Sequence, residues 1–205
     1  NSCIDSISKI ITIYPRAIPV VSADTLSGCT PLNVTFTNSS TAIEKYLWSF
    51  GDQTTSTLPA PSHEYINKGQ KPISFTVTLN MTSIHGCKSI LALPNYITVY
   101  PTPFANFTSS PKSADESAPT INFNNKSTGA VFFRWTFGDG DSSDVTDPIH
   151  KFTDEGTYNT CLVATNQNGC KDTVCNNIII NPISSFYIPN AFTPGNGGKN
   201  NVFRP

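Results

Sequence analysis

One motif occurs twice in the chain, and its spacing sets the size of the folding unit. Tyr46-Leu-Trp-Ser-Phe-Gly-Asp52 returns as Phe133-Arg-Trp-Thr-Phe-Gly-Asp139, so that Trp48 and Trp135 lie 87 positions apart. A repeat of this length predicts one small domain used at least twice, an arrangement more typical of proteins that hold or reach than of enzymes. The match continues downstream, where Pro61-Ser-His63-Glu-Tyr65 pairs with Pro148-Ile-His150-Lys-Phe152, and Gly86-Cys87-Lys88 pairs with Gly169-Cys170-Lys171.

Apolar and polar residues alternate along much of the chain, as in Leu32-Asn-Val34-Thr-Phe36 and Phe75-Thr-Val77-Thr-Leu79. This period of two predicts strands that bury one face, and no stretch has the 3.6-residue period of a helix. The 16 Pro and 12 Gly separate short strands at hairpin spacing. We therefore predict an all-β chain of antiparallel sandwiches. The aromatic residues of each motif fall on one strand face, which predicts that Trp48 and Trp135 are central in a core.

The composition limits the partners of the chain. Charged residues are 13% of the sequence and the formal net charge is −1, whereas the usual charged share is about 25%. Such a chain lacks the basic surface that nucleic acid or an anionic membrane face requires, so we expect neither partner. No apolar run approaches the roughly 18 residues of a membrane span, and we expect no direct membrane insertion. A surface rich in Ser, Thr and Asn instead favours a secreted protein.

His63 and His150 are the first candidates for catalysis. Each occupies the same place in the repeated motif, beside an aromatic residue of a predicted strand, and we interpret both as buried, hydrogen-bonded core histidines. Asp52 and Asp139, which end the tryptophan motif, are assigned to the same structural motif. The chain has three histidines and no Gly-x-Ser-x-Gly motif, so no pattern supports nucleophilic catalysis. We predict that the protein is not an enzyme and has no cofactor.

A run of acidic residues in the second copy is the strongest candidate metal site. Closely spaced carboxylates in a loop can bind calcium. The first copy has mostly uncharged residues at these positions, and the Gly and Asp of a turn also bond to their own backbone. We therefore favour a turn and keep calcium as the weaker interpretation. The four carboxylates are those of Asp139, Asp141, Asp144 and Asp147.

The repeated motif resembles the PKD domain. The resemblance rests on Trp-x-Phe-Gly-Asp, then Pro-x-His-x-aromatic, then Gly followed in the second copy by Thr157-Tyr158. It covers residues 16–101 and 102–182 and implies tandem immunoglobulin-like sandwiches of about seven strands each. Residues 1–15 repeat the end of the unit, which predicts the last strand of a preceding PKD domain.

The first copy departs from this pattern at two places. It has Asp52-Gln53 where the second copy has Asp139-Gly140. The number of positions between matching residues of the two copies also falls by four after Gly69. This change predicts an insertion at Gln70-Lys71-Pro72-Ile73. We expect looser turns in the first copy.

The six cysteines predict disulfides in a chain placed outside the cell. The placement of Cys29 and Cys87 resembles a frequent pair in such bacterial modules and implies a disulfide within the first copy. Cys161 and Cys175 flank the Asn168-Gly169 turn, which would place them opposite each other across a hairpin. No Cys-x-x-Cys motif supports a zinc site. The cysteines left over are Cys3 and Cys170, and the partner of each stays open.

The end of the chain carries a second resemblance. Phe186-Tyr-Ile-Pro-Asn-Ala-Phe-Thr-Pro194, followed by Val202-Phe203-Arg204, is similar to the start of the gliding-motility-associated C-terminal domain. In Bacteroidota that domain is a sorting signal for type IX secretion, which implies the secretion or outer-membrane machinery as a partner. Residues 183–205 are thus expected to be its truncated start. The loop has Gly195-Asn-Gly-Gly198 where the family usually has aspartates.

Three short triplets resemble the Asp-Ser/Thr-apolar sites at which Bacteroidota O-glycosylate exported proteins. The resemblance implies modification of Ser6, Thr25 or Thr173.

Together these features predict a stalk or spacer without catalytic activity, in a bacterial surface adhesin or filament of the gliding or attachment type. Short linkers with proline, such as Tyr100-Pro-Thr-Pro103, limit bending between modules. Its expected partners are neighbouring domains of the same polypeptide and a surface polysaccharide or protein. The alternative is a pair of accessory substrate-binding modules in a secreted hydrolase. Polymerisation by exchange of edge strands is a weaker third interpretation.

Overall fold

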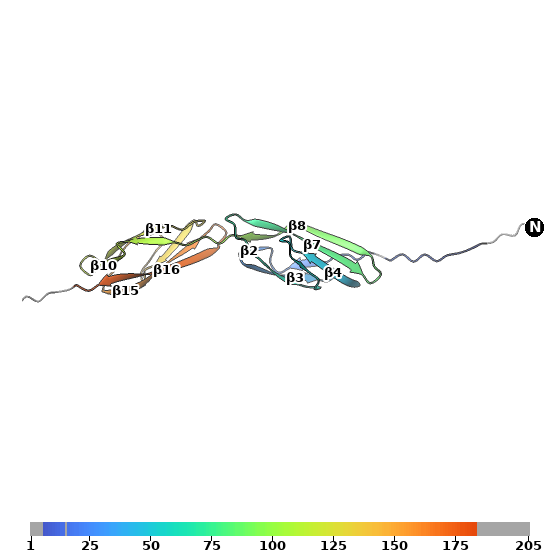
Figure 1. The fold of residues 1–205 in the computed structure, drawn as a ribbon, viewed down its shortest axis with the longest axis horizontal. Coiled ribbons are helices and arrows are strands. Elements are labelled where there is room, and N and C mark those ends of the chain that lie inside the picture. Colours follow the sequence, from blue (N-terminus) through green and yellow to red (C-terminus); the bar gives the residue numbers. More distant parts are fainter. Residues whose placement is uncertain (1–5, 15, 184–205) are drawn as a thin grey trace, which may run out of the picture.

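The computed structural model of the protein describes residues 6–14 and 16–183. Two β-sandwiches follow each other along the long axis of the molecule, and the N-terminal segment leads away from the first (Figure 1). The described residues form strands and no helix, so the all-β prediction is confirmed. None of these residues belongs to a helix that could cross a membrane. We call residues 16–101 repeat one and residues 102–182 repeat two.

Repeat one packs a five-stranded sheet against a three-stranded sheet. The larger has the order β2-β8-β7-β4-β5 and the smaller has the order β1-β3-β6. All neighbours are antiparallel except β2 and β8, which run parallel. The strands are β1 (Val21–Ala23), β2 (Ser27–Cys29), β3 (Leu32–Asn38), β4 (Ile43–Ser49), β5 (Thr55–Ser56), β6 (Ser62–Tyr65), β7 (Ile73–Ser83) and β8 (Lys88–Tyr100).

Repeat two has the same plan. Its sheets have the orders β10-β16-β15-β12-β13 and β14-β11-β9, with one parallel pair, β10 and β16. The strands are β9 (Phe107–Ser110), β10 (Ser113–Asp115), β11 (Thr120–Asn125), β12 (Phe132–Thr136), β13 (Ser142–Ser143), β14 (Ile149–Lys151), β15 (Gly156–Thr165) and β16 (Lys171–Asn181).

The two repeats differ at the approach to β7 and within β8. Three residues of the apparent insertion at 70–73 lie in the loop before β7, and the fourth, Ile73, begins that strand. The pairing of β7 with β8 then shifts register between Phe75 and Val77, opposite Asn95, which has a positive φ of 51°. This bulge accounts for the two further residues by which β8 exceeds its counterpart, because β15 and β16 pair without a shift.

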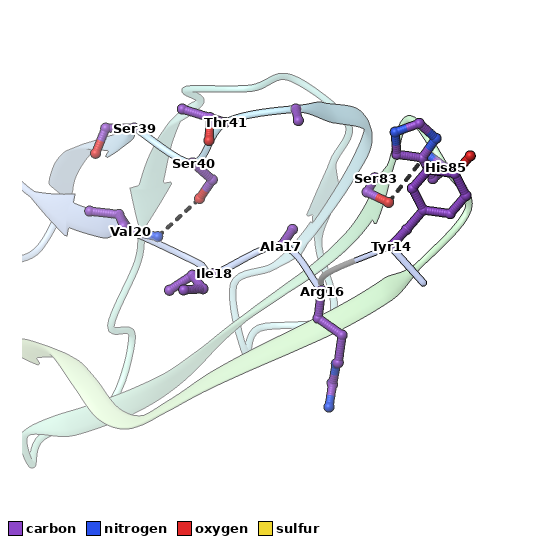
Figure 2. Close-up of a pocket in the computed structure, with 11 residues that line it drawn as sticks. Tyr14, Arg16, Ala17, Ile18, Val20, Ser39, Ser40, Thr41, Ser83 and His85 are labelled. Atoms are coloured by element: carbon purple, nitrogen blue, oxygen red, sulfur yellow. Dashed lines mark hydrogen bonds between the residues drawn. The ribbon is translucent and has the colours of Figure 1, made fainter. Parts of the chain in front are cut away.

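A linker along one edge of repeat one leads into β1. The backbone N–H of Val20 donates to Ser40 Oγ at 2.9 Å, and the ring of Tyr14 stacks on that of His85 with centroids 3.7 Å apart. Between them lies a hollow of 640 Å³, which we call the N-terminal hollow (Figure 2). Its lining includes Tyr14, Arg16, Ala17, Ile18, Ser40, Thr41 and His85.

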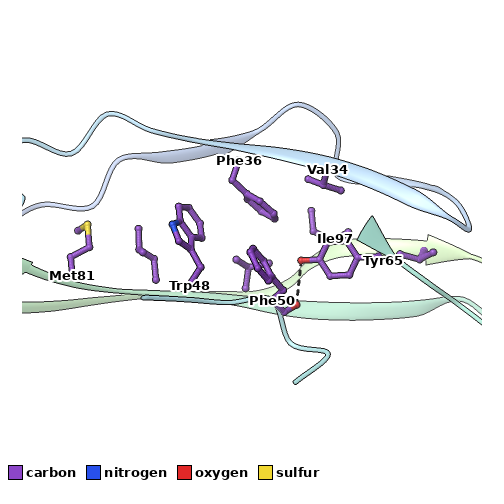
Figure 3. Packing of buried hydrophobic residues seen from close by; sticks show 10 residues of the cluster. Val34, Phe36, Trp48, Phe50, Tyr65, Met81 and Ile97 are labelled. Carbon is purple, nitrogen blue, oxygen red and sulfur yellow. Dashed lines mark hydrogen bonds between the residues drawn. The ribbon is translucent and has the colours of Figure 1, made fainter. Parts of the chain in front are cut away.

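Each sandwich has a core of aromatic and branched residues between its two sheets. In β3 the buried residues Val34 and Phe36 alternate with exposed neighbours, as the period of two predicts. Figure 3 shows Phe36 facing Trp48 across the sandwich, and their ring centroids are 5.3 Å apart. Trp48 and Trp135 are both 0% exposed. The prediction that they lie inside the two cores is confirmed.

Residues 6–14 differ from the expectation of a last strand. They form no strand, and Ile11 and Ile13 are 80% and 87% exposed. Their counterparts in repeat one, Ile97 and Val99, are fully buried in β8. The physical reason is that a strand needs a neighbour with which to pair, and the described residues offer residues 6–14 none. Cys3 and the predicted sorting segment, apart from residue 183, lie outside the described residues.

Candidate functional site

The repeated motif builds a polar pair at the rim of each core. In repeat one His63 Nε2 lies 2.7 Å from Asp52 Oδ2, and in repeat two His150 Nε2 lies 2.6 Å from Asp139 Oδ2. A carboxylate can only accept, so Nε2 carries the proton and donates it in both. The histidine ring also stacks on the phenylalanine of the motif, with centroids 4.2 Å apart in repeat one and 4.0 Å in repeat two.

A tight turn after the phenylalanine places the aspartate under the histidine. Gly138 makes this turn with a φ of +93°, and a Cβ there would meet the backbone of Asn159 at 2.9 Å. The aspartate then accepts from the backbone two residues further on, Asp141 N to Asp139 Oδ1 at 3.0 Å. Gly, Asp and His in the motif are therefore required by one local geometry.

Burial and hydrogen bonding act against each other on the two aspartates. Burial alone would raise the pKa of Asp139, but the hydrogen bonds from His150 and from the backbone of Asp141 outweigh it, and its pKa is lowered. The pKa of Asp52 is lowered in the same way, against its burial, by hydrogen bonds from Thr54 and His63. Both carboxylates are thereby held charged against their histidines.

This geometry lacks the relay of a catalytic triad. In repeat one Thr54 Oγ1 lies 3.3 Å from His63 Nε2, but Asp52 bonds to the same nitrogen. A triad needs the acid on one ring nitrogen and the nucleophile on the other. Thr54 also donates to Asp52 at 2.5 Å, so its proton is directed away from the histidine. The arrangement supports the structural role expected for the pair.

His63 and His150 differ in depth. The side chain of His150 is 10% exposed and that of His63 is 15% exposed, so both lie largely inside, and His150 is the deeper of the two. The indole N–H of the tryptophan makes an equivalent hydrogen bond to a backbone carbonyl in both repeats. Trp48 Nε1 donates to the carbonyl of Leu58 at 3.0 Å, and Trp135 Nε1 donates to that of Val145 at 2.9 Å.

The four carboxylates of the calcium candidate do not converge. Asp144 is held by Arg134, with both oxygens 3.0 Å from Nη1. Asp147 Oδ1 accepts from the backbone of Asn125 at 2.7 Å. Only Asp139 and Asp141 remain together, with their ligand atoms within 4.8 Å of each other and of His150. Since both Asp139 oxygens already accept hydrogen bonds, the arrangement is that of the favoured turn.

The disulfide predicted between Cys29 and Cys87 is wrong. Cys29 is bonded to Cys170, with Cα atoms 5.5 Å apart, and Cys87 forms no disulfide within the described residues. The reason is position: β2 ends at Cys29 beside the exit from repeat one, where the β15–β16 turn of repeat two arrives. The second disulfide joins Cys161 to Cys175, the pair expected across the hairpin.

The junction of the two repeats is a site that sequence reasoning missed. Asn166 Nδ2 donates to the carbonyl of Pro101 at 2.8 Å, and the backbone of Ala105 donates to Asp172 Oδ2 at 2.8 Å. Thr102 Oγ1 donates to the carbonyl of Thr30 at 3.2 Å. The linker is thus fixed to both repeats beside the disulfide. The sequence did contain a signal for it: Cys29 has no counterpart in repeat two, whereas the Gly-Cys pair at Cys87 and Cys170 occurs in both repeats.

The three candidate glycosylation residues sit in different settings. Ser6 and Thr173 are exposed, and Thr173 lies in β16. Thr25 is partly buried, and its Oγ1 donates to the carbonyl of Ser27 at 3.0 Å. Ser6 and Thr173 are therefore the accessible members of the set.

Comparison with known proteins agrees with the fold. The family model of the PKD domain matches residues 16–91 and 100–180. The PKD1 domain of the Vibrio cholerae metalloprotease PrtV is 25% identical, with a TM-score of 0.35, over 39% of this chain and 98% of its own. The PKD1 domain of Vibrio anguillarum Epp is 23% identical, with a TM-score of 0.35, over 40% of this chain and 95% of its own.

A longer structure is more distant in sequence. The calcium-stabilised adhesin with which an Antarctic bacterium binds ice is 11% identical, with a TM-score of 0.41, over 82% of this chain and 50% of its own. No curated protein matches the chain.

Proposed function

The chain belongs to the PKD-domain family, with two copies in tandem, and from this premise we propose that it is a non-catalytic extracellular spacer of a bacterial surface protein. The observation that carries the proposal is the junction. The Cys29–Cys170 disulfide and the bonds of the linker hold two sandwiches end to end along one axis. Disulfides persist in oxidising compartments, which supports a place outside the cytoplasm.

A fixed junction is what a spacer requires. A flexible joint would let the second domain fold back, so the reach of the array would shrink with each added module. Here the linker bonds to both repeats and a covalent bridge crosses beside it. Force applied along the axis would be carried by the ladders of the sheets and by this bridge.

Small-angle scattering of the oxidised chain tests the spacer function. We expect the profile of an extended particle with the two repeats in series, as in Figure 1. The matched control replaces both cysteines of the junction, Cys29→Ser with Cys170→Ser, and should give a wider distribution of inter-domain distances. A compact particle in which the repeats lie side by side would contradict the proposal.

The finer part of the proposal concerns the organism and the export route. We propose an adhesin or filament of Bacteroidota, of the gliding or attachment type, exported by type IX secretion. Its support is the resemblance of Phe186–Pro194 and Val202–Arg204 to the start of a sorting domain. Detection of the protein on the surface of cells with an intact type IX pathway, and its loss when that pathway is inactivated, is the expected result. Surface display without the pathway would refute it.

The alternative, a substrate-binding role in a secreted hydrolase, is supported by fewer observations than the spacer function. Most aromatic rings lie in the cores, but Phe104 and Phe132 are 61% and 64% exposed. Exposed aromatic rings can stack on sugar rings. Retention of the chain on an insoluble polysaccharide, lost in Phe132→Ala, would favour this role over a spacer, and no retention would leave the spacer as the function.

A further inference from the structure

We propose that Cys87 forms a disulfide with a further PKD domain on the N-terminal side of repeat one, at the position that Cys29 holds in repeat one. The N-terminal hollow is the surface on which that domain docks. The inference extends the proposed spacer function, because it predicts that an equivalent disulfide joins each pair of neighbouring PKD domains. It needs a preceding repeat, but its failure would leave the observed junction and the spacer role intact.

Cys87 is held in the same turn as the bonded Cys170. The backbone of Cys87 donates to Ser83 Oγ at 3.1 Å, and its carbonyl accepts from Ser83 N at 2.9 Å. The backbone of Cys170 donates to Asn166 Oδ1 at 2.9 Å, and its carbonyl accepts from Asn166 N at 2.9 Å. The β7–β8 turn therefore presents a thiol where the β15–β16 turn presents a disulfide sulfur.

The linker before repeat one also docks as the linker before repeat two does. Val20 N donates to Ser40 Oγ at 2.9 Å, and Asn106 N donates to Ser127 Oγ at 3.1 Å. In both places the linker residue accepts a bond in return, at 2.9 Å and 2.8 Å. Because the two linkers make the same contacts, a preceding domain would approach repeat one from the same side as repeat one approaches repeat two.

The end of the linker then brings the missing partner to Cys87. In the observed junction Tyr100 of β8 is the register partner of Cys29 of β2. The position of this tyrosine therefore indicates where the bonded cysteine of the N-terminal domain of a pair lies. Tyr14 occupies the matching place in Ile11-Thr-Ile-Tyr-Pro15. Its carbonyl lies 3.8 Å from Cys87 Sγ. A cysteine that pairs with Tyr14 as Cys29 pairs with Tyr100 would meet this sulfur.

Two surfaces near Cys87 lack the contacts that their counterparts have. Arg16 and Thr41 line the N-terminal hollow, and the matching residues of repeat two line a hollow that the 68–70 loop of repeat one closes from the other side. Ile11 and Ile13 expose the side chains that β8 buries at Ile97 and Val99. A preceding sandwich of the same family would cover both surfaces at once, which is why we assign the hollow to this partner.

The bond forms by oxidation of two thiols. Cys87 and the incoming cysteine each lose a proton, their sulfurs join, and two electrons pass to an oxidised disulfide of a small thiol or of a thiol oxidoreductase, which is reduced to two thiols. Exchange proceeds through a mixed disulfide with one of the two cysteines. Cys87 is partly exposed and open to such an oxidant.

A three-repeat chain tests the inference. Residues 16–101 replace residues 1–15, so a copy of repeat one with its own Cys29 and Cys87 precedes residues 16–205 and joins them through its own Tyr100-Pro101. The protein is oxidised with glutathione disulfide, digested without reduction and mapped by mass spectrometry. We expect a peptide that links Cys29 of the copy to Cys87 of the following repeat, and its loss in a control with Cys87→Ser at that following repeat.

The observed junction serves as the internal standard. Where the Cys29–Cys170 peptide is present, no Cys29–Cys87 peptide is found and Cys29 is partly alkylated as a free thiol, the inference is overturned. A Cys29–Cys87 peptide that persists in the Cys87→Ser control lies inside the copy and overturns it as well. If this chain does not fold, a second version carries Thr102-Pro-Phe104 in place of Arg16-Ala-Ile18 at the new junction, and the same peptides decide.

Discussion

Replacing Asp139 by Asn should weaken repeat two at neutral pH and should do so less in acid. The substitution keeps the shape of the side chain but removes the charge that His150 Nε2 meets at 2.6 Å and that the backbone of Asp141 meets at 3.0 Å. The Asp139 side chain is 14% exposed, so water replaces little of what is lost. Asp139→Asn therefore removes the charge from both hydrogen bonds. Because Asn has one accepting oxygen and one donating NH2 group, the bond to His150 persists only if the imidazole proton moves to Nδ1.

The size of the effect follows from these bonds. A hydrogen bond to a charged group contributes about 1.5–3 kcal/mol and a neutral one about 0.5–1.5 kcal/mol, so two such bonds predict a loss of about 2–3 kcal/mol in the free energy of unfolding. For a domain of this size each kcal/mol lowers Tm by about 4–8 °C. The melting temperature of repeat two should thus fall by about 8–24 °C.

The sign of the pH dependence comes from the lowered pKa of Asp139. A carboxyl whose pKa is lower in the folded state stabilises the fold above its unfolded pKa of about 3.9 and loses that contribution as pH falls through the folded value. The difference between the wild type and Asp139→Asn should be complete near neutrality. It should shrink below about pH 4 and vanish once both forms are uncharged.

The two tryptophans allow each repeat to be followed separately, since each repeat contains one. In a Trp48→Phe background, fluorescence during urea unfolding reports repeat two through Trp135. The matched control is Asp52→Asn, which makes the same change in repeat one and should leave the Trp135 transition in place. Should Asp139→Asn shift the transition equally at pH 7 and pH 2.5, or by less than about 0.3 kcal/mol at pH 7, the charged pair does not stabilise the repeat as argued.

Three further outcomes test the core, the turn and the hairpin disulfide. Trp135→Ala should cost repeat two about 3–5 kcal/mol in urea unfolding, since the indole is fully buried; a loss under about 1 kcal/mol would contradict its central place. Gly138→Ala should destabilise repeat two more than Gly140→Ala does, because both have positive φ but only Gly138 faces the β15 backbone within 3 Å; equal melting temperatures would show that this contact does not matter. Cys161→Ser with Cys175→Ser should lower stability by about 3 kcal/mol, measured against the oxidised chain with both disulfides intact; an unchanged midpoint would argue against a constraint from this bridge.

Much of the fold follows from short stretches of sequence. The period of two in β3 and β7 predicted their buried faces, and the motif around Trp48 and Trp135 predicted the residues at the centre of each core. The Asn168-Gly169 turn indicated the bridge across its own hairpin, because residues 14 positions apart can be placed by one turn. These features depend on neighbours in sequence, and local patterns record them.

Contacts between distant segments could not be predicted in the same way. The four carboxylates after Trp135 are close in sequence, but two of them turn away, Asp144 to Arg134 and Asp147 to the backbone of Asn125. The histidine and aspartate of the motif were assigned a structural role, but their contact required the turn at Gly138 and the strand β14 to come together.

A pair of like β-sandwiches with a tryptophan in each core could be inferred from the residues alone, because strand period and motif spacing are local patterns along the chain. The partner of Cys29, in contrast, depends on the three-dimensional arrangement of the two repeats. Its partner lies 141 positions away and in another domain, so the choice depends on how one sandwich is set upon the next. That placement brings the end of β2 to the β15–β16 turn and leaves Cys87 at the opposite end of repeat one, out of reach.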